Sequence, residues 1–239
     1  MARPIAFDLE PGTVLADKYR VRARLGGGWE GEVYQVVERG TGVHRAAKLF
    51  YPERNPANRT VRRYARQLEK LRGCPLTIDY HHTEEVEIDD RRATLLLSEL
   101  ARGRPLSSLP RDRRGAQMER FEALHLLHRL AQGLEAMHAA GLYHGDLHDG
   151  NVLVERRGIR FELRLFDFFN RGRTTRDAQQ GDVIDAVRLL YDCLGGVRTY
   201  RSQPEHIRTI CCGLKHTLIR RRFPTARHLV QHLENFSWE

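Results

Sequence analysis

Residues 143–151 have the sequence YHGDLHDGN, and the interpretation of the whole 239-residue chain starts from this stretch. It follows a long helical pattern and precedes a short apolar run at 152–154. Asp146 has a carboxylate that can accept or orient the proton of a hydroxyl group. Asn151 has an amide oxygen, which is a ligand that magnesium accepts. The stretch therefore predicts a loop that combines an acid for proton transfer with a ligand for a divalent metal.

Downstream, residues 165–169 (LFDFF) place a single acid, Asp167, inside an apolar segment. An isolated acid of this kind is usually satisfied by backbone amides. When it follows a loop such as 143–151, however, it is well placed to chelate magnesium that bridges phosphate groups. The order and spacing of Asp146, Asn151 and Asp167 predict a site of phosphoryl transfer.

A glycine-rich segment at 25–33 (LGGGWEGEV) fits G-x-G-x-x-G-x-V and lies between two predicted strands. A dinucleotide fingerprint would need a helix after the glycines. A loop between strands can instead fold over a triphosphate, unless it is only a flexible turn. The stretch 46–50 (AAKLF) is apolar except for Lys48. If Lys48 is half-buried, its ammonium needs an anionic partner; if the strand lies at a sheet edge, the side chain can extend to solvent instead. Together the two features favour a phosphate ligand.

Hydrophobic periodicity predicts an α+β fold with two lobes. We expect strands at 19–25, 32–38, 44–50, 83–88 and 93–97 and a helix at 58–72. Further helices are expected at 121–141, 183–194, 206–219 and 225–236, with a hairpin of 152–154 and 161–166. We therefore expect a small antiparallel β-sheet lobe with one helix at 1–97, a hinge at 98–104 and a mostly helical lobe at 105–239.

Composition narrows the class of protein. The 41% apolar and 30% charged residues are typical of a soluble globular protein, and no apolar run is long enough for a transmembrane helix. Without a signal-peptide pattern, a cytoplasmic location is the expectation. The net charge of +9 favours acidic partners, but the arginines are scattered, so nucleic acid is disfavoured as a partner. The four cysteines form no C-x-x-C pair, which argues against a zinc site.

On these motifs the chain resembles the protein kinase family over nearly its whole length. The resemblance implies a nucleotide site in the small lobe, formed by Gly26, Gly28, Gly31, Val33, Ala46, Lys48, Glu99 and Ala101. It implies catalytic roles for Asp146, Lys48, Asn151 and His148, and metal binding by Asn151 and Asp167. The implied cofactors are ATP and Mg²⁺ or Mn²⁺. Asp182 resembles the helical aspartate that braces the catalytic loop, and residues 223–229 resemble the R-P-T-A-x-x-L segment.

Several positions depart from the family pattern. Tyr64 falls where a helical glutamate would pair with Lys48, so Lys48 is expected to pair directly with phosphate or with Asp167. Gly145 replaces the arginine that commonly contacts a phosphorylated activation segment, which suggests activity without such phosphorylation. The interval from Asp167 to Asp182 is short and contains no A-P-E.

These departures leave the acceptor open. The sequence favours an ATP-dependent protein serine/threonine kinase. His148 replaces a lysine, and the resulting HGDLH loop resembles aminoglycoside phosphotransferases, so a small-molecule kinase is one alternative. A pseudokinase that acts as an interaction module is another, because the helical glutamate is missing. The sequence determines neither the acceptor nor the oligomeric state.

Overall fold

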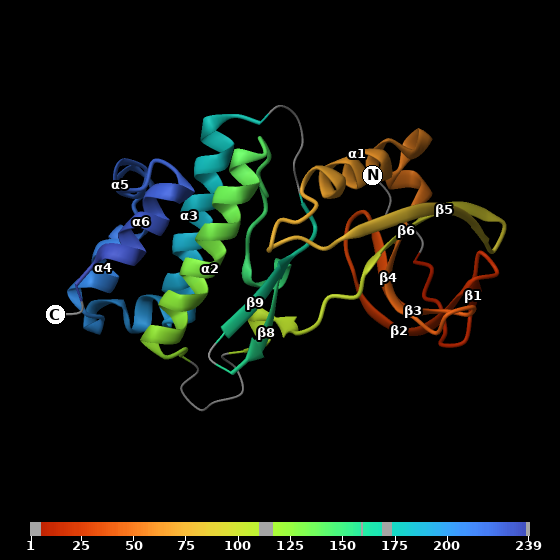
Figure 1. Ribbon diagram of the computed structural model, residues 1–239, viewed down its shortest axis with the longest axis horizontal. Coiled ribbons are helices and arrows are strands. Elements are labelled where there is room, and N and C mark those ends of the chain that lie inside the picture. The colour runs from red at the N-terminus through yellow and green to blue at the C-terminus, as the bar shows by residue number, and fades with distance from the viewer. Residues whose placement is uncertain (1–5, 110–116, 159, 169–173, 238–239) are drawn as a thin grey trace. The chain divides into compact units, whose positions relative to one another are not determined.

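A computed structural model describes residues 6–109, 117–158, 160–168 and 174–237. The chain divides into two compact units (Figure 1). Unit 1 comprises the residues up to 73 together with 78–101, and unit 2 comprises 74–77 together with 102–239. Each unit has its own secondary structure and core.

Unit 1 is built on a six-stranded antiparallel sheet with the strand order β1-β2-β3-β4-β6-β5. The strands are β1 (Val14–Leu15), β2 (Tyr19–Gly27), β3 (Gly31–Glu38), β4 (His44–Phe50), β5 (Tyr80–Ile88) and β6 (Arg91–Glu99). Alternate residues of β3, such as Tyr34 and Val36, are fully buried, as the period of a half-buried strand requires. β4 and β6 are buried more continuously, over residues 47–50 and 93–98.

One helix, α1 (Arg59–Lys70), belongs to unit 1. Its buried side chains, Val61, Tyr64 and Leu68, follow the i, i+3, i+7 spacing of a single helical face. This face packs toward the sheet, and the ring of Tyr64 meets that of Phe50 on β4 edge-on, with 6.3 Å between the centroids. The side chain at position 64 is therefore held next to the central strand.

Unit 2 is mostly helical. Its helices are α2 (Arg120–Ala139), α3 (Arg176–Cys193), α4 (Glu205–Cys211), α5 (His216–Arg222) and α6 (Ala226–Asn235). Figure 1 shows α2 packed along α3 and α6, and its buried side chains, among them Leu127 and Leu130, form the core of the unit. A small sheet of β7 (Arg104–Pro105), β8 (Val152–Arg157) and β9 (Arg160–Leu165) completes it.

Residues 74–77 belong to unit 2, although the chain on either side of them belongs to unit 1. The Leu165 amide donates to the Leu76 carbonyl (2.6 Å), and Thr77 forms a parallel bridge with Leu165. The side chain of Leu76 occupies the space beside Gly133 of α2, where an added Cβ would lie 1.9 Å from the Leu76 Cγ. Gly133 is therefore required for this close approach.

The structure confirms the predicted α+β class and corrects some element boundaries. A single helix at 206–219 is wrong: α4 ends at Cys211 and α5 begins at His216. Cys212, Gly213 and Leu214 all have positive φ, a conformation that breaks the helix. The helix expected at 183–194 begins earlier, at Arg176, because Thr175 caps its N-terminus. Part of the expected 165–169 segment, Phe169, lies outside the described residues.

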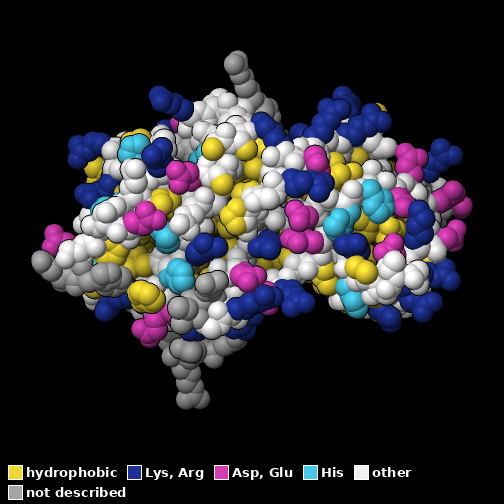
Figure 2. All heavy atoms as spheres, in the orientation of Figure 1, with side chains coloured by type: hydrophobic (Ala, Val, Ile, Leu, Met, Phe, Trp, Pro, Cys, Tyr) yellow, Lys and Arg dark blue, Asp and Glu magenta, His cyan; other side chains and the backbone are white. Residues whose placement is uncertain are grey.

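Among the described residues, no helix is both long and apolar enough to cross a membrane. On the face drawn in Figure 2, Lys and Arg side chains are interspersed with Asp and Glu. This distribution agrees with the expectation that the positive charge is spread over solvated surface.

The glycine-rich loop allows a paired stability prediction. An added Cβ at Gly31 would lie 2.1 Å from the Leu49 carbonyl oxygen of β4, whereas at Gly28 nothing lies within 4 Å. Neither glycine has a positive φ, so the comparison isolates the steric effect. We expect Gly31→Ala to lower the free energy of unfolding by about 1–3 kcal/mol, and Gly28→Ala to change it by less than about 1 kcal/mol. Urea unfolding of both variants measures the difference, and equal midpoints would contradict the close approach.

Candidate active site

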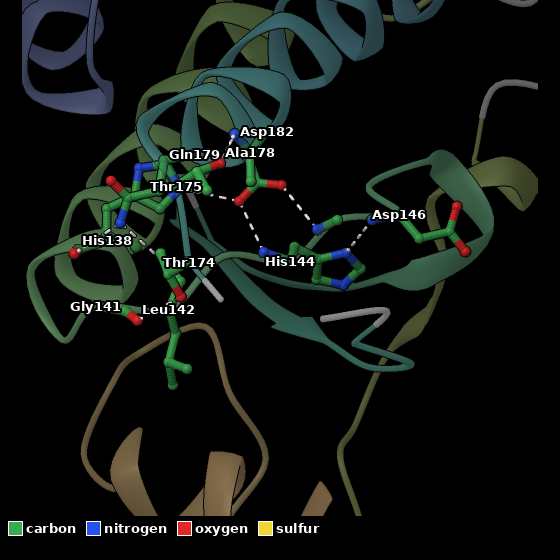
Figure 3. Close-up of polar contacts among 12 residues, drawn as sticks. His138, Gly141, Leu142, His144, Asp146, Thr174, Thr175, Ala178, Gln179 and Asp182 are labelled. Atoms are coloured by element: carbon green, nitrogen blue, oxygen red, sulfur yellow. Dashed lines mark hydrogen bonds and ion pairs between the residues drawn. The ribbon is translucent and has the colours of Figure 1, made fainter. Parts of the chain in front are cut away.

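Helix α3 is anchored at its N-terminus beside the end of α2. The Thr175 hydroxyl accepts a hydrogen bond from the Ala178 amide (3.1 Å), which caps α3. The side-chain Nε2 of Gln179 donates hydrogen bonds to the backbone carbonyls of His138 (3.0 Å) and Leu142 (3.2 Å) (Figure 3). These bonds satisfy backbone groups where α2 ends, and they place the next turn of α3 under the 143–151 loop.

Asp182, in that next turn, is the buried centre of the site (Figure 3). Its side chain is 0% exposed. Oδ2 accepts hydrogen bonds from the His144 amide (2.8 Å) and the His138 Nε2 (2.9 Å), and Oδ1 accepts one from the Gly145 amide (2.9 Å). Two of these donors are successive backbone amides, so the carboxylate defines the conformation of the loop, in the bracing role that the resemblance implied.

Gly145 has a φ of 80° while its amide donates to Asp182. This is the left-handed region, in which glycine is free of the strain that a side chain would introduce. The residue that replaces the family's arginine therefore fits the backbone that the Asp182 contact requires.

His144 joins the loop to the segment that contains Asp167. Its Nδ1 accepts from the Asp146 amide (3.3 Å), so the proton of the neutral ring is on Nε2, which donates to the Phe166 carbonyl (3.1 Å). Its ring also contacts that of Phe168, with 5.0 Å between the centroids. Burial lowers the pKa of His144, although the charges of Asp182, Asp146 and Asp167 oppose the change. A neutral histidine therefore lies among three acids.

Asn151 bridges the same two segments. Its Nδ2 donates to the Asp146 carbonyl oxygen (2.9 Å) and lies 3.5 Å from the Asp146 Oδ2. The backbone carbonyl oxygen of Asn151 accepts a hydrogen bond from the Phe166 backbone amide (3.3 Å). Asp146, Asn151 and the residue before Asp167 are thus brought together within unit 2. Asp167 itself adopts a positive φ of 56°, which turns the chain at that point.

The donor set fits a divalent cation that shares its ligands with a nucleotide. Nδ2 of Asn151 is used within the protein, so Oδ1 is the atom of this side chain that suits a cation. Among the described residues no group of three His, Cys, Asp or Glu side chains is assembled into a metal site. One amide oxygen and one carboxylate suit Mg²⁺, which keeps water and phosphate oxygens in its remaining positions.

His148 lies beside Asp146 with 3.8 Å between Nε2 and Oδ2, and both side chains are 53% exposed. The His148 Nδ1 accepts from the Gly150 amide (3.1 Å), so the neutral ring has its proton on Nε2, the nitrogen that faces Asp146. The ring therefore caps the short turn at Asp149–Asn151 and also presents a donor near the proposed base.

The surroundings of a second acid on α3, Asp185, disfavour the charged form of its side chain. Burial and the charge of Asp182 raise the pKa of Asp185 to about 6, above its ordinary value of 3.8. A folded-state pKa that is raised gives stability at low pH and removes it as the pH rises past that value. We therefore expect Asp185→Asn to be more stable than the wild type by about 1 kcal/mol at pH 8, a reduced figure because the side chain is partly exposed. Urea unfolding from pH 4 to pH 8 measures this, and a gain that does not shrink toward pH 4 would contradict it.

The candidate nucleotide-binding residues all belong to unit 1. Gly26 is the last residue but one of β2, Gly31 is the first residue of β3, and Val33 of β3 pairs with Lys48 on β4. Gly28 donates from its amide to the Gly31 carbonyl (2.9 Å), which closes the loop. The remaining candidates are Ala46 on β4, Glu99 at the end of β6 and Ala101 just after it. The structure thus places this set around β2, β3, β4 and the end of β6.

The Lys48 ammonium has a carboxylate partner that the sequence did not indicate. Its Nζ lies 3.4 Å from the Glu30 Oε2 and 4.7 Å from the centroid of the Tyr64 ring. Tyr64 is buried on α1, as expected for the position of the missing glutamate. Glu69 points elsewhere and pairs with Arg72 at 2.6 Å. The available signal for Glu30 was an acid in the glycine-rich loop, combined with a helix that has no acid on its buried face. His138 gave no sequence signal.

The two-unit architecture and the braced loop define the protein kinase class. The family model described as "Protein kinase domain" matches residues 19–208. The chain belongs to the protein kinase family, which uses ATP and a divalent metal, and the predicted membership is confirmed.

Similar proteins agree with this assignment. The chain is 32% identical over 155 residues to a "Putative cyclin-dependent kinase F-2" of Oryza sativa subsp. japonica, covering 64% of this chain and 46% of the relative. It is 27% identical over 160 residues to "Serine/threonine-protein kinase PknA" of Mycobacterium tuberculosis, covering 66% of this chain and 36% of the relative. The chain thus spans less than half the length of these curated relatives.

Solved structures extend the likeness to the fold. The kinase domain of M. tuberculosis PknI superposes with a TM-score of 0.67 at 21% identity, covering 95% of this chain and 98% of that one. The predicted protein-kinase-like fold class is confirmed.

Proposed function

We propose that this chain is an ATP-dependent protein serine/threonine kinase domain. The proposal depends on one observation, the Asp182 carboxylate that holds the amides of His144 and Gly145 and so places Asp146 beside Asn151. The family assignment and the serine/threonine kinases among the relatives support it. Residues 1–97 would bind the nucleotide, 98–104 would form the hinge and 105–239 would provide catalysis.

In this function, Asp146 orients the acceptor hydroxyl and takes its proton as the hydroxyl oxygen attacks the terminal phosphorus of ATP, and the bond from that phosphorus to the oxygen of the leaving ADP breaks. A side chain that is half exposed and hydrogen-bonded at its backbone can reach an incoming substrate without rearrangement of the loop. Asn151 Oδ1 and the Asp167 carboxylate would hold Mg²⁺ or Mn²⁺, which supplies charge neutralisation on the phosphates. Lys48 would add a fixed positive charge from β4.

His148 would donate from Nε2 toward the transferring group. It is a weaker electrostatic partner than the lysine of other family members when neutral, and comparable when protonated. The acceptor is proposed to be a protein. The cytoplasmic location expected from the sequence stays a prediction.

Labelling with γ-³²P-ATP and Mg²⁺ tests the proposal. We expect incorporation of label into the chain itself or into added generic protein substrates, at serine or threonine on phosphoamino-acid analysis. Transfer only to small hydroxyl compounds would assign the small-molecule function instead. Binding of nucleotide without transfer to any acceptor, or no binding, would favour the pseudokinase.

A further inference from the structure

Lys48 is a buried cation that needs a defined counter-charge. It lies in the middle of β4, paired with Val33 on one side and Leu96 on the other, and its side chain is only 10% exposed. Removing an ammonium from water is costly unless a nearby anion compensates. The structure must therefore provide a partner within reach of this strand.

The helix that would be expected to supply the acid supplies an aromatic ring. The Lys48 Nζ lies 4.7 Å from the centroid of the Tyr64 ring and 5.2 Å from that of the Phe50 ring. Two ring faces stabilise a cation by their quadrupoles, but they carry no net negative charge. The nearest acid along α1, Glu69, is 54% exposed and is paired with Arg72. At position 64, α1 therefore contributes an uncharged ring to the surroundings of Lys48 and no carboxylate.

The glycine-rich loop provides that counterion. The Glu30 carboxylate lies 3.4 Å from the Lys48 Nζ through Oε2 and 3.7 Å from Arg63 of α1 through Oε1, and it is 18% exposed. It thus lies between the strand lysine and a cation of the helix. This is the linkage between β4 and α1 that an acid on the helix itself would make.

The loop is held so that Glu30 keeps this position. The Glu30 carbonyl accepts from the Tyr51 amide (2.9 Å), and the Gly28 amide donates to Gly31 (2.9 Å). The neighbouring Trp29 ring lies 3.3 Å from the centre of the Arg54 guanidinium, a stacked cation–π contact. Both backbone and side-chain contacts therefore fix the loop tip against unit 1.

We propose that Glu30 and Tyr64 together replace the missing helical acid, so that Glu30 is the positioning residue for Lys48. The inference rests on the proposed phosphotransfer function for its kinetic consequence, but not for the ion pair itself. Glu30 holds the ammonium in place, and the rings of Tyr64 and Phe50 lie beside it. The conformation of the glycine-rich loop, rather than that of helix α1, then determines whether the Lys48 ammonium is positioned to bind a phosphate.

A direct chemical readout tests the ion pair without any need for catalysis. Loss of a carboxylate beside Lys48 favours the neutral amine, which is the form that acylates. In the full chain, we expect Glu30→Gln to increase the rate of Lys48 acetylation by dilute acetic anhydride about three- to tenfold, measured by mass spectrometry at pH 8. Glu69→Gln is the matched control and leaves the rate unchanged. An unchanged rate in Glu30→Gln overturns the inference.

A kinetic experiment tests the positioning role. We expect Glu30→Gln to lower kcat of phosphotransfer about tenfold or more with a much smaller change in the KM for ATP, and Glu69→Gln to change neither. Moving the acid back to the helix, in Glu30→Gln combined with Tyr64→Glu, restores kcat at least threefold over Glu30→Gln alone. If the double variant does not fold, Glu30→Asp is expected to lie between the wild type and Glu30→Gln.

Two outcomes overturn the proposal. Activity of Glu30→Gln that equals the wild type would show that Lys48 needs no such partner. A kcat that rises, with a lower KM, would show that Glu30 blocks phosphate from Lys48 instead of positioning it. If the wild type transfers no phosphate, the proposed function fails, while the acetylation experiment still decides the ion pair.

Discussion

Asp146→Asn is expected to reduce phosphotransfer by about 10²–10⁴-fold while leaving the fold and the binding of Mg-ATP intact. The amide has nearly the shape of the carboxylate but cannot take a proton from the acceptor hydroxyl. The Asp146 side chain is half exposed, and its main contact with Asn151 runs through its backbone carbonyl, which the substitution keeps. The kinetics of γ-³²P transfer measure the loss.

Two controls make this result specific. Titration with a fluorescent ATP analogue is expected to give the same affinity for the wild type and Asp146→Asn, and urea unfolding the same midpoint. Asp149→Asn changes an exposed acid of the same loop and is expected to keep near-normal transfer. Full activity of Asp146→Asn, or equal losses in both variants, would remove Asp146 from the role of base.

Asp182→Ala is expected to lower the free energy of unfolding by about 4 kcal/mol and to abolish transfer. The substitution leaves two successive buried backbone amides, those of His144 and Gly145, without an acceptor, and it frees the His138 Nε2. Each lost bond to a charged acceptor costs about 1.5–3 kcal/mol, less whatever the loop recovers by relaxing. Urea denaturation gives the change in stability.

Asp182→Asn serves as the graded comparison. The amide keeps one oxygen that can still accept from one backbone amide, so we expect a loss of stability about half as large. The order wild type, Asp182→Asn, Asp182→Ala in both stability and activity supports the bracing role. If Asp182→Ala were as stable as the wild type, the loop would be held by other contacts.

The sequence predicted those parts of the fold whose signals are local. β4 was predicted with its observed bounds, His44–Phe50, because its buried run and the preceding turn lie within a few residues. The helix expected at 206–219 was wrong because apolar periodicity does not report backbone handedness. Cys212 and Leu214 adopt positive φ, which side chains rarely accept and no pattern announced.

For the candidate site, the local motifs were sufficient to select Asp146, Asn151 and Asp167. The structure brings Asp146, Asn151 and Phe166, the residue before Asp167, together. The partner of Lys48 was not predicted, because Glu30 reaches it only through the loop's folded conformation. His138, which donates to Asp182 from a different helix, was missed for the same reason: its contact joins residues 44 positions apart.

The excursion of residues 74–77 into unit 2 affects how the protein can be dissected. The polypeptide passes from unit 1 into unit 2 at residue 74, returns to unit 1 at residue 78 and enters unit 2 again at residue 102. No single cut therefore yields both units whole. An expression fragment that ends at residue 101 would include Leu76 and Thr77, so the rest of unit 2 would lose their backbone contacts with Leu165. Proteolytic nicking between 73 and 78 would, by the same reasoning, loosen both halves at once, and recombinant separation of the two requires a graft of these four residues instead of a simple truncation.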